Sequence, residues 1–189
     1  MRYVTGLSLI LVLCGLSLLF WGAKVTRVIF LPICFLVFMI PFPFVEDLGF
    51  QLQSISLHSS AWILSGFGLP ISTSGAEIHL GENTFTVGLQ CSGINSLVAL
   101  GTLAAVYAFL LRGATYKRVT LFFLSFPIAI LANIFRIVSI ILVANYRGVA
   151  IATGFYHDIS SVIFFMFAFL FLLLLGRLWG CRLTLPDFE

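Results

Sequence analysis

Cys91 is the first residue whose type and position are suited to chemistry. It lies between a predicted strand and a predicted helix, and Ser92 and Gly93 follow it. The backbone amides at a helix start favour the thiolate, which is the nucleophilic form of cysteine. The simpler interpretation is a small buried residue, because free cysteine is among the most often buried types. Its location favours the nucleophile, since the other cysteines fall in apolar runs or in the carboxyl-terminal tail: Cys14, Cys34 and Cys181.

Arg136 is the second such residue, because it interrupts a long apolar run. An arginine at the centre of a membrane helix costs from about 2.5 to more than 10 kcal/mol, so such residues usually face a polar interior and mark functional sites. Asn133 precedes it by one helical turn on the same face. The alternative is a side chain that extends to the nearer membrane surface. Eight apolar or small residues separate Arg136 from Asn145, which favours the functional interpretation.

His157 is the third residue, at the outer end of the last apolar run. A histidine titrates near neutral pH and can act as acid or base, although a polar aromatic residue at the membrane surface is an equally good interpretation. Asp158 is interpreted mainly as a helix-start residue that is favourable for the helix dipole, and only weakly as a partner of His157. His58 and His79 are interpreted as solvated.

Neither a metal nor a cofactor is expected. The sequence contains no HExxH or CxxC pattern and no glycine-rich phosphate loop. No basic patch interleaved with aromatic residues supports nucleic-acid binding either.

The elements that hold these residues belong to a membrane protein. Of the 189 residues, 61% are hydrophobic and only 9% are charged, against about 25% charged in a soluble domain. About 20 apolar residues cross the hydrocarbon core as a helix. Five runs are long enough, so we expect an all-α polytopic membrane protein with a single membrane domain. The predicted spans are 7–23, 28–45, 95–111, 119–144 and 159–175.

The charges of the loops predict the orientation. If the loop 112–120 is cytoplasmic, seven of the ten basic residues lie inside and five of the seven acidic residues lie outside. This agrees with the positive-inside rule, to which acidic residues contribute little. We therefore expect a multi-pass protein of the cytoplasmic membrane with its amino terminus outside, its carboxyl terminus in the cytoplasm and Cys91 facing outward.

Residues 46–92 form a long outer segment between the second and third spans. Leu48, Leu52, Ile55 and Trp62 recur at roughly helical spacing, which predicts a surface-lying helix of about 15 residues. Alternation over 76–80 and 84–87, with the turn residues 81–83 between, predicts a β-hairpin that leads directly to Cys91.

These motifs together resemble the exosortase/archaeosortase family of membrane transpeptidases. The run CSGINS begins at Cys91, the run ANIFRI covers residues 132–137, and His157 follows in the same order and spacing. The resemblance extends over about residues 54–175, although many family members have more amino-terminal helices. It implies that Cys91 is the nucleophile and that Arg136 and His157 complete the catalytic site. Asn133, Ser92 and Gly93 match supporting positions of the motifs.

The resemblance also implies a reaction and a partner. Cys91 would form a thioester with a membrane-anchored substrate protein, whose carboxyl-terminal sorting signal has a short motif, a membrane helix and a basic tail. An outer-face acceptor would then take the acyl group. We expect a water-accessible cleft between spans three, four and five, and an extended motif that pairs with the hairpin.

Two other classes of function remain open from the residues alone. A small transporter would use Arg136 to bind an anion and His157 to move protons, but no internal repeat and no second intramembrane charge supports it. A non-enzymatic membrane scaffold would use the outer hairpin for docking and would not need Cys91.

Overall fold

The computed structural model describes residues 2–40, 43–81, 83–88 and 91–183. They form two compact units, Met1–Asp47 and Leu48–Glu189. The first holds a helical hairpin, and the second holds a helix bundle and a small sheet. Glu82, in the predicted hairpin turn, lies outside the described residues.

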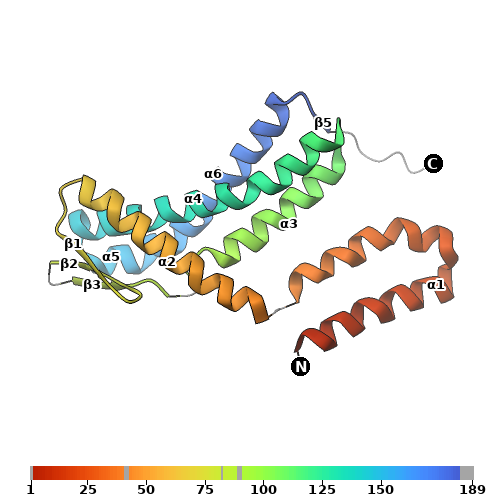
Figure 1. Ribbon diagram of the computed structural model, residues 1–189, viewed down its shortest axis with the longest axis horizontal. Coiled ribbons are helices and arrows are strands. Elements are labelled where there is room, and N and C mark those ends of the chain that lie inside the picture. Colours follow the sequence, from red (N-terminus) through yellow and green to blue (C-terminus); the bar gives the residue numbers. More distant parts are fainter. Residues whose placement is uncertain (1, 41–42, 82, 89–90, 184–189) are drawn as a thin grey trace. The chain divides into compact units, whose positions relative to one another are not determined.

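The first unit is built from two helical arms. α1 (Arg2–Phe35) is interrupted at Gly22, whose φ of 74° is not helical, and there the chain reverses (Figure 1). Ser17 and Thr26, on opposite sides of the break, share a hydrogen bond of 2.8 Å. η1 (Leu36–Met39) follows, so the helical structure of the second arm ends at Met39, before the predicted span 28–45 would end.

The bundle of the second unit consists of α3 (Ile94–Leu110), α4 (Thr115–Arg147) and α6 (Phe155–Leu178). α4 packs against both other helices (Figure 1). The short α5 (Val149–Thr153) connects α4 to α6, and β4 (Leu111–Arg112) pairs with β5 (Arg182–Leu183). The bundle core is apolar and includes Leu100, Ala104, Leu121, Ala129 and Leu172.

α3 and α6 approach closely at Gly176. A Cβ atom there would overlap the ring of Tyr107, and the Tyr107 hydroxyl donates to the Leu173 carbonyl at 3.2 Å. Small residues at such points let membrane helices pack at short distance.

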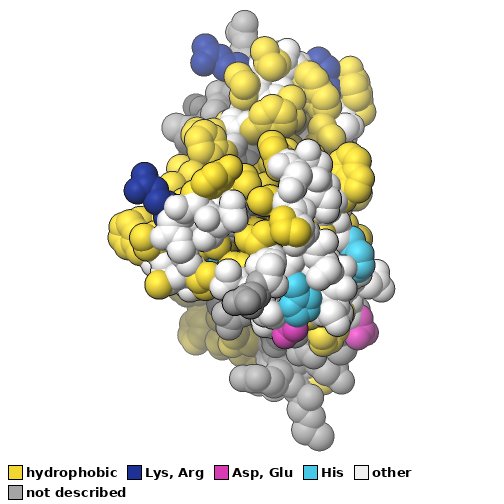
Figure 2. All heavy atoms as spheres, turned by 90° about the vertical axis from the view of Figure 1, so that its left-hand side faces the viewer, with side chains coloured by type: hydrophobic (Ala, Val, Ile, Leu, Met, Phe, Trp, Pro, Cys, Tyr) yellow, Lys and Arg dark blue, Asp and Glu magenta, His cyan; other side chains and the backbone are white. Residues whose placement is uncertain are grey.

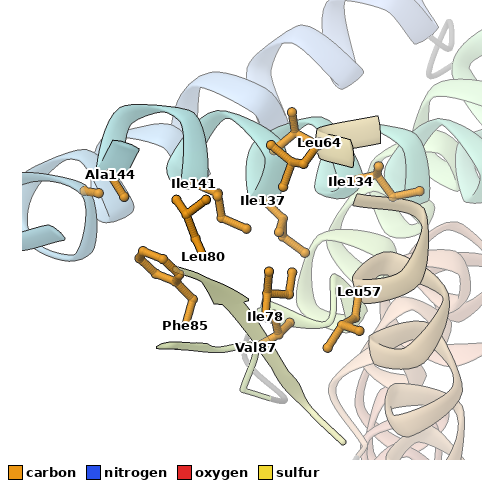
Figure 3. Close-up of a cluster of buried hydrophobic side chains, with 12 residues drawn as sticks. Leu57, Leu64, Ile78, Leu80, Phe85, Val87, Ile134, Ile137, Ile141 and Ala144 are labelled. Atoms are coloured by element: carbon orange, nitrogen blue, oxygen red, sulfur yellow. The ribbon is translucent and has the colours of Figure 1, made fainter. Parts of the chain in front are cut away.

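The predicted hairpin is present, and one more strand extends it. β2 (Glu77–Leu80) and β3 (Asn83–Thr86) are antiparallel, and β1 (Ile71–Ser74) adds to the other edge of β2. Alternate side chains of the hairpin are buried, and they pack on the second half of α4 and on α2 (Pro43–Gly66), as Figure 3 shows. This second cluster includes Leu57, Ile78, Phe85, Ile137 and Ile141.

The outer helix is longer than predicted, and most of its predicted apolar face is exposed, as expected for a surface-lying helix. α2 has 24 residues, and its expected apolar face is mostly outside: Ile55 is 51% exposed and Trp62 79%. Its buried face carries leucines, such as Leu57 and Leu64, together with Ser56 and Ser60. The hydroxyls of these two serines donate to the backbone carbonyls of Ser92 and Ile134. Large apolar side chains on the outer face are what a lipid-facing helix presents, so hydrophobicity does not mark the inside of this helix.

The all-α membrane class is confirmed. By length and composition alone, the described segments that can cross a membrane are Val4–Phe30, which contains the break at Gly22, and the helices α4 and α6, while α3 is apolar but shorter. The observed helices extend past the predicted spans 119–144 and 159–175 at both ends. The number of crossings stays a prediction.

Candidate active site

Cys91 lies in the tight turn between β3 and α3. Its amide donates to the Gly88 carbonyl at 2.8 Å, and Gly93 caps α3 with φ 89°. Glycine is required at this position for two reasons. The left-handed conformation disfavours other residues, and a Cβ atom would lie 2.9 Å from the Asn133 side chain.

Arg136 enters the site from α4 and is only 5% exposed. Its Nη2 group donates to His157 Nε2 at 3.2 Å and lies 3.8 Å from Cys91 Sγ. Within the described residues, no carboxylate lies within ion-pair distance of Arg136. Its positive charge is therefore free to stabilise an anion in the site, and in a buried environment this electrostatic effect is strong.

His157 comes from the first turn of α6, and its Nε2 lies 3.3 Å from Cys91 Sγ. A guanidinium only donates hydrogen bonds, so the network assigns the Nε2 lone pair as the acceptor and the ring proton to Nδ1. Nδ1 faces the Asp158 carboxylate at 3.3 Å. In this tautomer Nε2 can take the thiol proton.

Asp158 is a partner that the sequence interpretation undervalued. Neighbouring residues on a helix point in different directions, which argued against a contact. The carboxylate nevertheless reaches back to the ring of His157, while its side chain stays 88% exposed. His58 is exposed, as expected, and His79 is partly buried beside Thr84.

Asn133 links the parts of the site. Its Nδ2 group donates to the Cys91 carbonyl at 2.9 Å and to Ser56 Oγ at 3.2 Å. Its Oδ1 accepts from Arg136 Nη1 at 3.4 Å. One buried amide therefore holds the nucleophile turn, the guanidinium and α2 together.

Ser92 and Gly93 shape the turn and are not among the residues that line the cavity beside Cys91. The Ser92 side chain is buried, and its hydroxyl accepts from the Ile94 amide at 3.4 Å. Sequence reasoning missed Ser56 and also Gln53, whose side-chain amide donates to the Val87 carbonyl at the end of β3. The polar residues that repeat along α2 were the available signal.

A cavity of about 150 Å³ opens beside the thiol and the imidazole. Its walls are β3, the second half of α4, α5 and His157, so α3 contributes only the turn that precedes it. This differs from the expected cleft between three spans, because the nucleophile lies before α3 begins. The cavity is lined by Thr84, Phe85, Thr86, Val87, Cys91, Ile137, Ile140, Ile141, Thr153 and His157.

The surroundings carry few charges. Figure 2 shows histidine side chains and a few Asp, Glu, Lys or Arg side chains among hydrophobic and uncharged ones. No group of three His, Cys, Asp or Glu side chains in the described part of the chain is arranged to hold a metal ion. All four cysteines are free thiols. The arrangement is a thiol, an imidazole and a guanidinium in mutual contact, which suits nucleophilic acyl transfer.

Comparison with known proteins identifies the family of the chain. The family model described as transmembrane exosortase matches residues 2–174. No curated protein and no solved structure matches the chain significantly. At the level of the family, this is a multi-pass membrane protein of the transpeptidase and protease type that acts on proteins with sorting signals. The chain belongs to the transmembrane exosortase family.

Proposed function

We propose that the protein is a cysteine transpeptidase that cleaves carboxyl-terminal sorting signals through a thioester on Cys91. The observation that carries the proposal is the contact of three groups: Sγ lies 3.3 Å from His157 Nε2, and Arg136 Nη2 reaches both. A nucleophile within hydrogen-bond reach of a base that is itself oriented by a third group is the arrangement of covalent catalysis.

The reaction follows from these positions. His157 Nε2 takes the thiol proton, and the thiolate attacks the scissile carbonyl carbon. The positive charge of Arg136 stabilises the oxyanion of the tetrahedral intermediate. The carbon–nitrogen bond breaks as His157 returns the proton to the leaving amine, which leaves the thioester. His157 then deprotonates the acceptor nucleophile, which displaces Cys91 and regenerates the thiol.

The substrate would bind along β3. Val87 donates its amide to the Ala76 carbonyl, so these two residues are a hydrogen-bonded pair. In antiparallel strands, residues that bond to the neighbouring strand alternate with residues that point away from it. The backbone N–H and C=O groups of Thr84 and Thr86 therefore point away from β2. An extended peptide can pair with that free edge and run toward Cys91. Beyond Thr84 and Thr86, the wall is formed mainly by Phe85, Ile137 and Ile141, which favours an uncharged, apolar side chain next to the scissile bond.

The proposed placement puts the cavity on the outer side of the cytoplasmic membrane. The basic loop between α3 and α4 and the basic end of α6 would face the cytoplasm. α4 has 33 residues, or about 50 Å of helix, which is longer than the roughly 30 Å hydrocarbon core. Arg136 lies 11 residues before its end at Arg147, so a protruding α4 would bring the guanidinium near the outer membrane surface.

The test is processing of an exported reporter that ends in a short motif, an apolar helix and a basic tail from a protein of the same cell. Cys91→Ala is expected to abolish cleavage, whereas Cys34→Ala, a half-buried thiol in α1, should cleave normally. Mass spectrometry of the wild type, sampled during turnover, should find a substrate-derived acyl group on Cys91 that hydroxylamine removes, and the His157→Ala variant should lack this group.

Continued processing by Cys91→Ala would contradict the proposal. Docking of the reporter without cleavage by the wild type would instead indicate a scaffold, and anion uptake that depends on Arg136 would indicate a transporter.

A further inference from the structure

A second, much smaller cavity lies beside Arg136 and does not include Cys91 or His157. The polar residues that line it come from three helices: Ser96 from α3, Asn133 and Arg136 from α4, and Ser161 from α6. The rest of the wall is apolar, including Leu100, Phe164 and Phe165. Its volume is about 10 Å³, which is close to the space that one water molecule needs.

Asn133 already has hydrogen-bond partners, but three other polar groups at this cavity have none among the described residues. Among the described residues, Arg136 Nε is the buried side-chain nitrogen or oxygen without a hydrogen bond. Neither Ser96 nor Ser161 makes a side-chain hydrogen bond within the described part of the chain, although serine hydroxyls in helices commonly bond to the preceding turn. A buried N–H group without a partner is costly, and buried polar groups are normally satisfied by protein or by ordered water.

We infer that one ordered water molecule occupies this cavity and bridges Arg136 Nε to the hydroxyls of Ser96 and Ser161. The Nε–H group donates to the water oxygen, and the water donates to the two serine oxygens. A water with about three hydrogen bonds is the usual occupant of a polar cavity of this size. A halide ion in the same place would accept from the Nε–H group and from the two serine hydroxyls, which would then act as donors, so the experiment has to separate the two.

The consequence concerns the orientation of the guanidinium, and it rests on the proposed function of Arg136. The guanidinium is planar, so holding Nε on one side fixes the direction of Nη2 on the other. Nη2 is the group that reaches His157 and Cys91. Ser96 and Ser161 are therefore positioning residues, and Ser161 lies one helical turn after His157 on α6.

The first measurement needs no substrate. The full-length protein, labelled with ¹⁵N-arginine, is placed in lipid nanodiscs, and its Nε signals are recorded. The signal that is lost in Arg136→Lys belongs to Arg136. We expect a cross-peak from its Nε–H to a bound water, and we expect Ser161→Val, which fills the cavity, to remove it. Ser125→Ala changes a buried serine of α4 that bonds the Phe122 carbonyl, and it should leave the cross-peak unchanged.

A cross-peak that persists in Ser161→Val, or that connects Nε directly to a serine hydroxyl, would overturn the water site. Dependence of the Nε signal on chloride in otherwise identical buffer would assign the site to an anion and overturn it as well. If Ser161→Val does not fold, Ser96→Ala and Ser161→Ala replace it. Each removes one hydroxyl partner and should speed hydrogen exchange of the Nε–H group about tenfold.

The second measurement tests positioning. Iodoacetamide labelling at fixed neutral pH, read by peptide mass spectrometry, reports Cys91 and Cys34 separately. Ser161→Val should slow labelling of Cys91 about tenfold and leave Cys34 unchanged, while Ser161→Thr, which keeps a hydroxyl, should restore the rate. Equal Cys91 labelling in all variants would refute the positioning role. Because neither measurement requires cleavage, this inference and the proposed transpeptidase activity can fail independently.

Discussion

The two halves of α4 lie in different surroundings. From Leu121 to Ala129 the helix packs into an apolar bundle with α3 and α6, where the contacts are mainly hydrocarbon. From Asn133 to Ala144 it packs against the sheet and α2, and that half carries the buried Asn133 and Arg136. The first half gains stability from shape and close packing, whereas the second also depends on specific hydrogen bonds. Stability and catalysis should therefore respond to different substitutions along one helix.

The largest effect is expected from removing the charge in the second half. Arg136→Gln keeps a polar side chain but removes the cation beside Cys91 and His157. Loss of an oxyanion-stabilising donor usually lowers kcat by about 100-fold to 1,000-fold. Single-turnover cleavage of the reporter measures it. An Arg136→Gln variant with at least half of the wild-type kcat would show that catalysis does not depend on the second half of α4 more than on the first.

A substitution in the apolar bundle should instead lower the stability of the protein and leave kcat unchanged. Leu172→Ala truncates a side chain of α6 with no exposed surface and should lower the free energy of unfolding by about 2 kcal/mol or more. The folded fraction should retain the wild-type kcat. Thermal unfolding in nanodiscs and activity at low temperature separate the two quantities. A large fall in kcat without destabilisation would contradict the division.

Two glycines with left-handed backbones, Gly93 and Gly68, allow a matched test at the turn that precedes α3. Gly93→Ala should cost about 1–2 kcal/mol from its left-handed backbone, and it should also lower kcat because the methyl group displaces Asn133. Gly68→Ala has the same backbone penalty at φ 78° but meets nothing within 4 Å. Equal kcat values in the two variants would mean that displacement of Asn133 has no catalytic effect.

The smallest effect is expected at Asp158. Asp158→Asn keeps the shape of the side chain and removes a carboxylate that is 88% exposed, so solvent screens much of its interaction with His157. We expect kcat/KM to fall by about threefold, within the range of an exposed ion pair. Glu77→Gln, on the sheet, serves as the control. A loss of more than about 30-fold would give Asp158 a central role in the reaction.

Much of the fold could be predicted from the sequence because apolar runs and strand alternation are local signals. The hairpin and the main helices were found in this way. Cys91, Arg136 and His157 were singled out by residue type and position, and the family resemblance then implied their roles. The inner face of α2 could not be found. Membrane helices meet apolar surroundings on both sides, so Ile55 and Trp62 carry no information on which face packs inside.

The contacts that connect distant segments were equally out of reach. Asn133 and Ser56 are 77 residues apart, and no spacing rule relates them. β1 was missed because its polar run of Ser and Thr lacks the strict alternation of the hairpin, although its β-branched residues favour a strand. The residues that sequence reasoning missed are mostly the polar ones that hold the site, and those that it found are mostly the reacting ones.

The contact between Gly176 and Tyr107 has a consequence for the imidazole at the other end of α6. Gly176 lies 19 residues after His157, or about 28 Å along the helix axis. If α6 tilts at Gly176, His157 moves with it, and a tilt of only about 5° over that length displaces His157 by more than 2 Å. The absence of a side chain at Gly176 lets α6 pack closely on Tyr107. This contact, far from the site, therefore helps to set the distance between the Cys91 sulfur and the His157 imidazole.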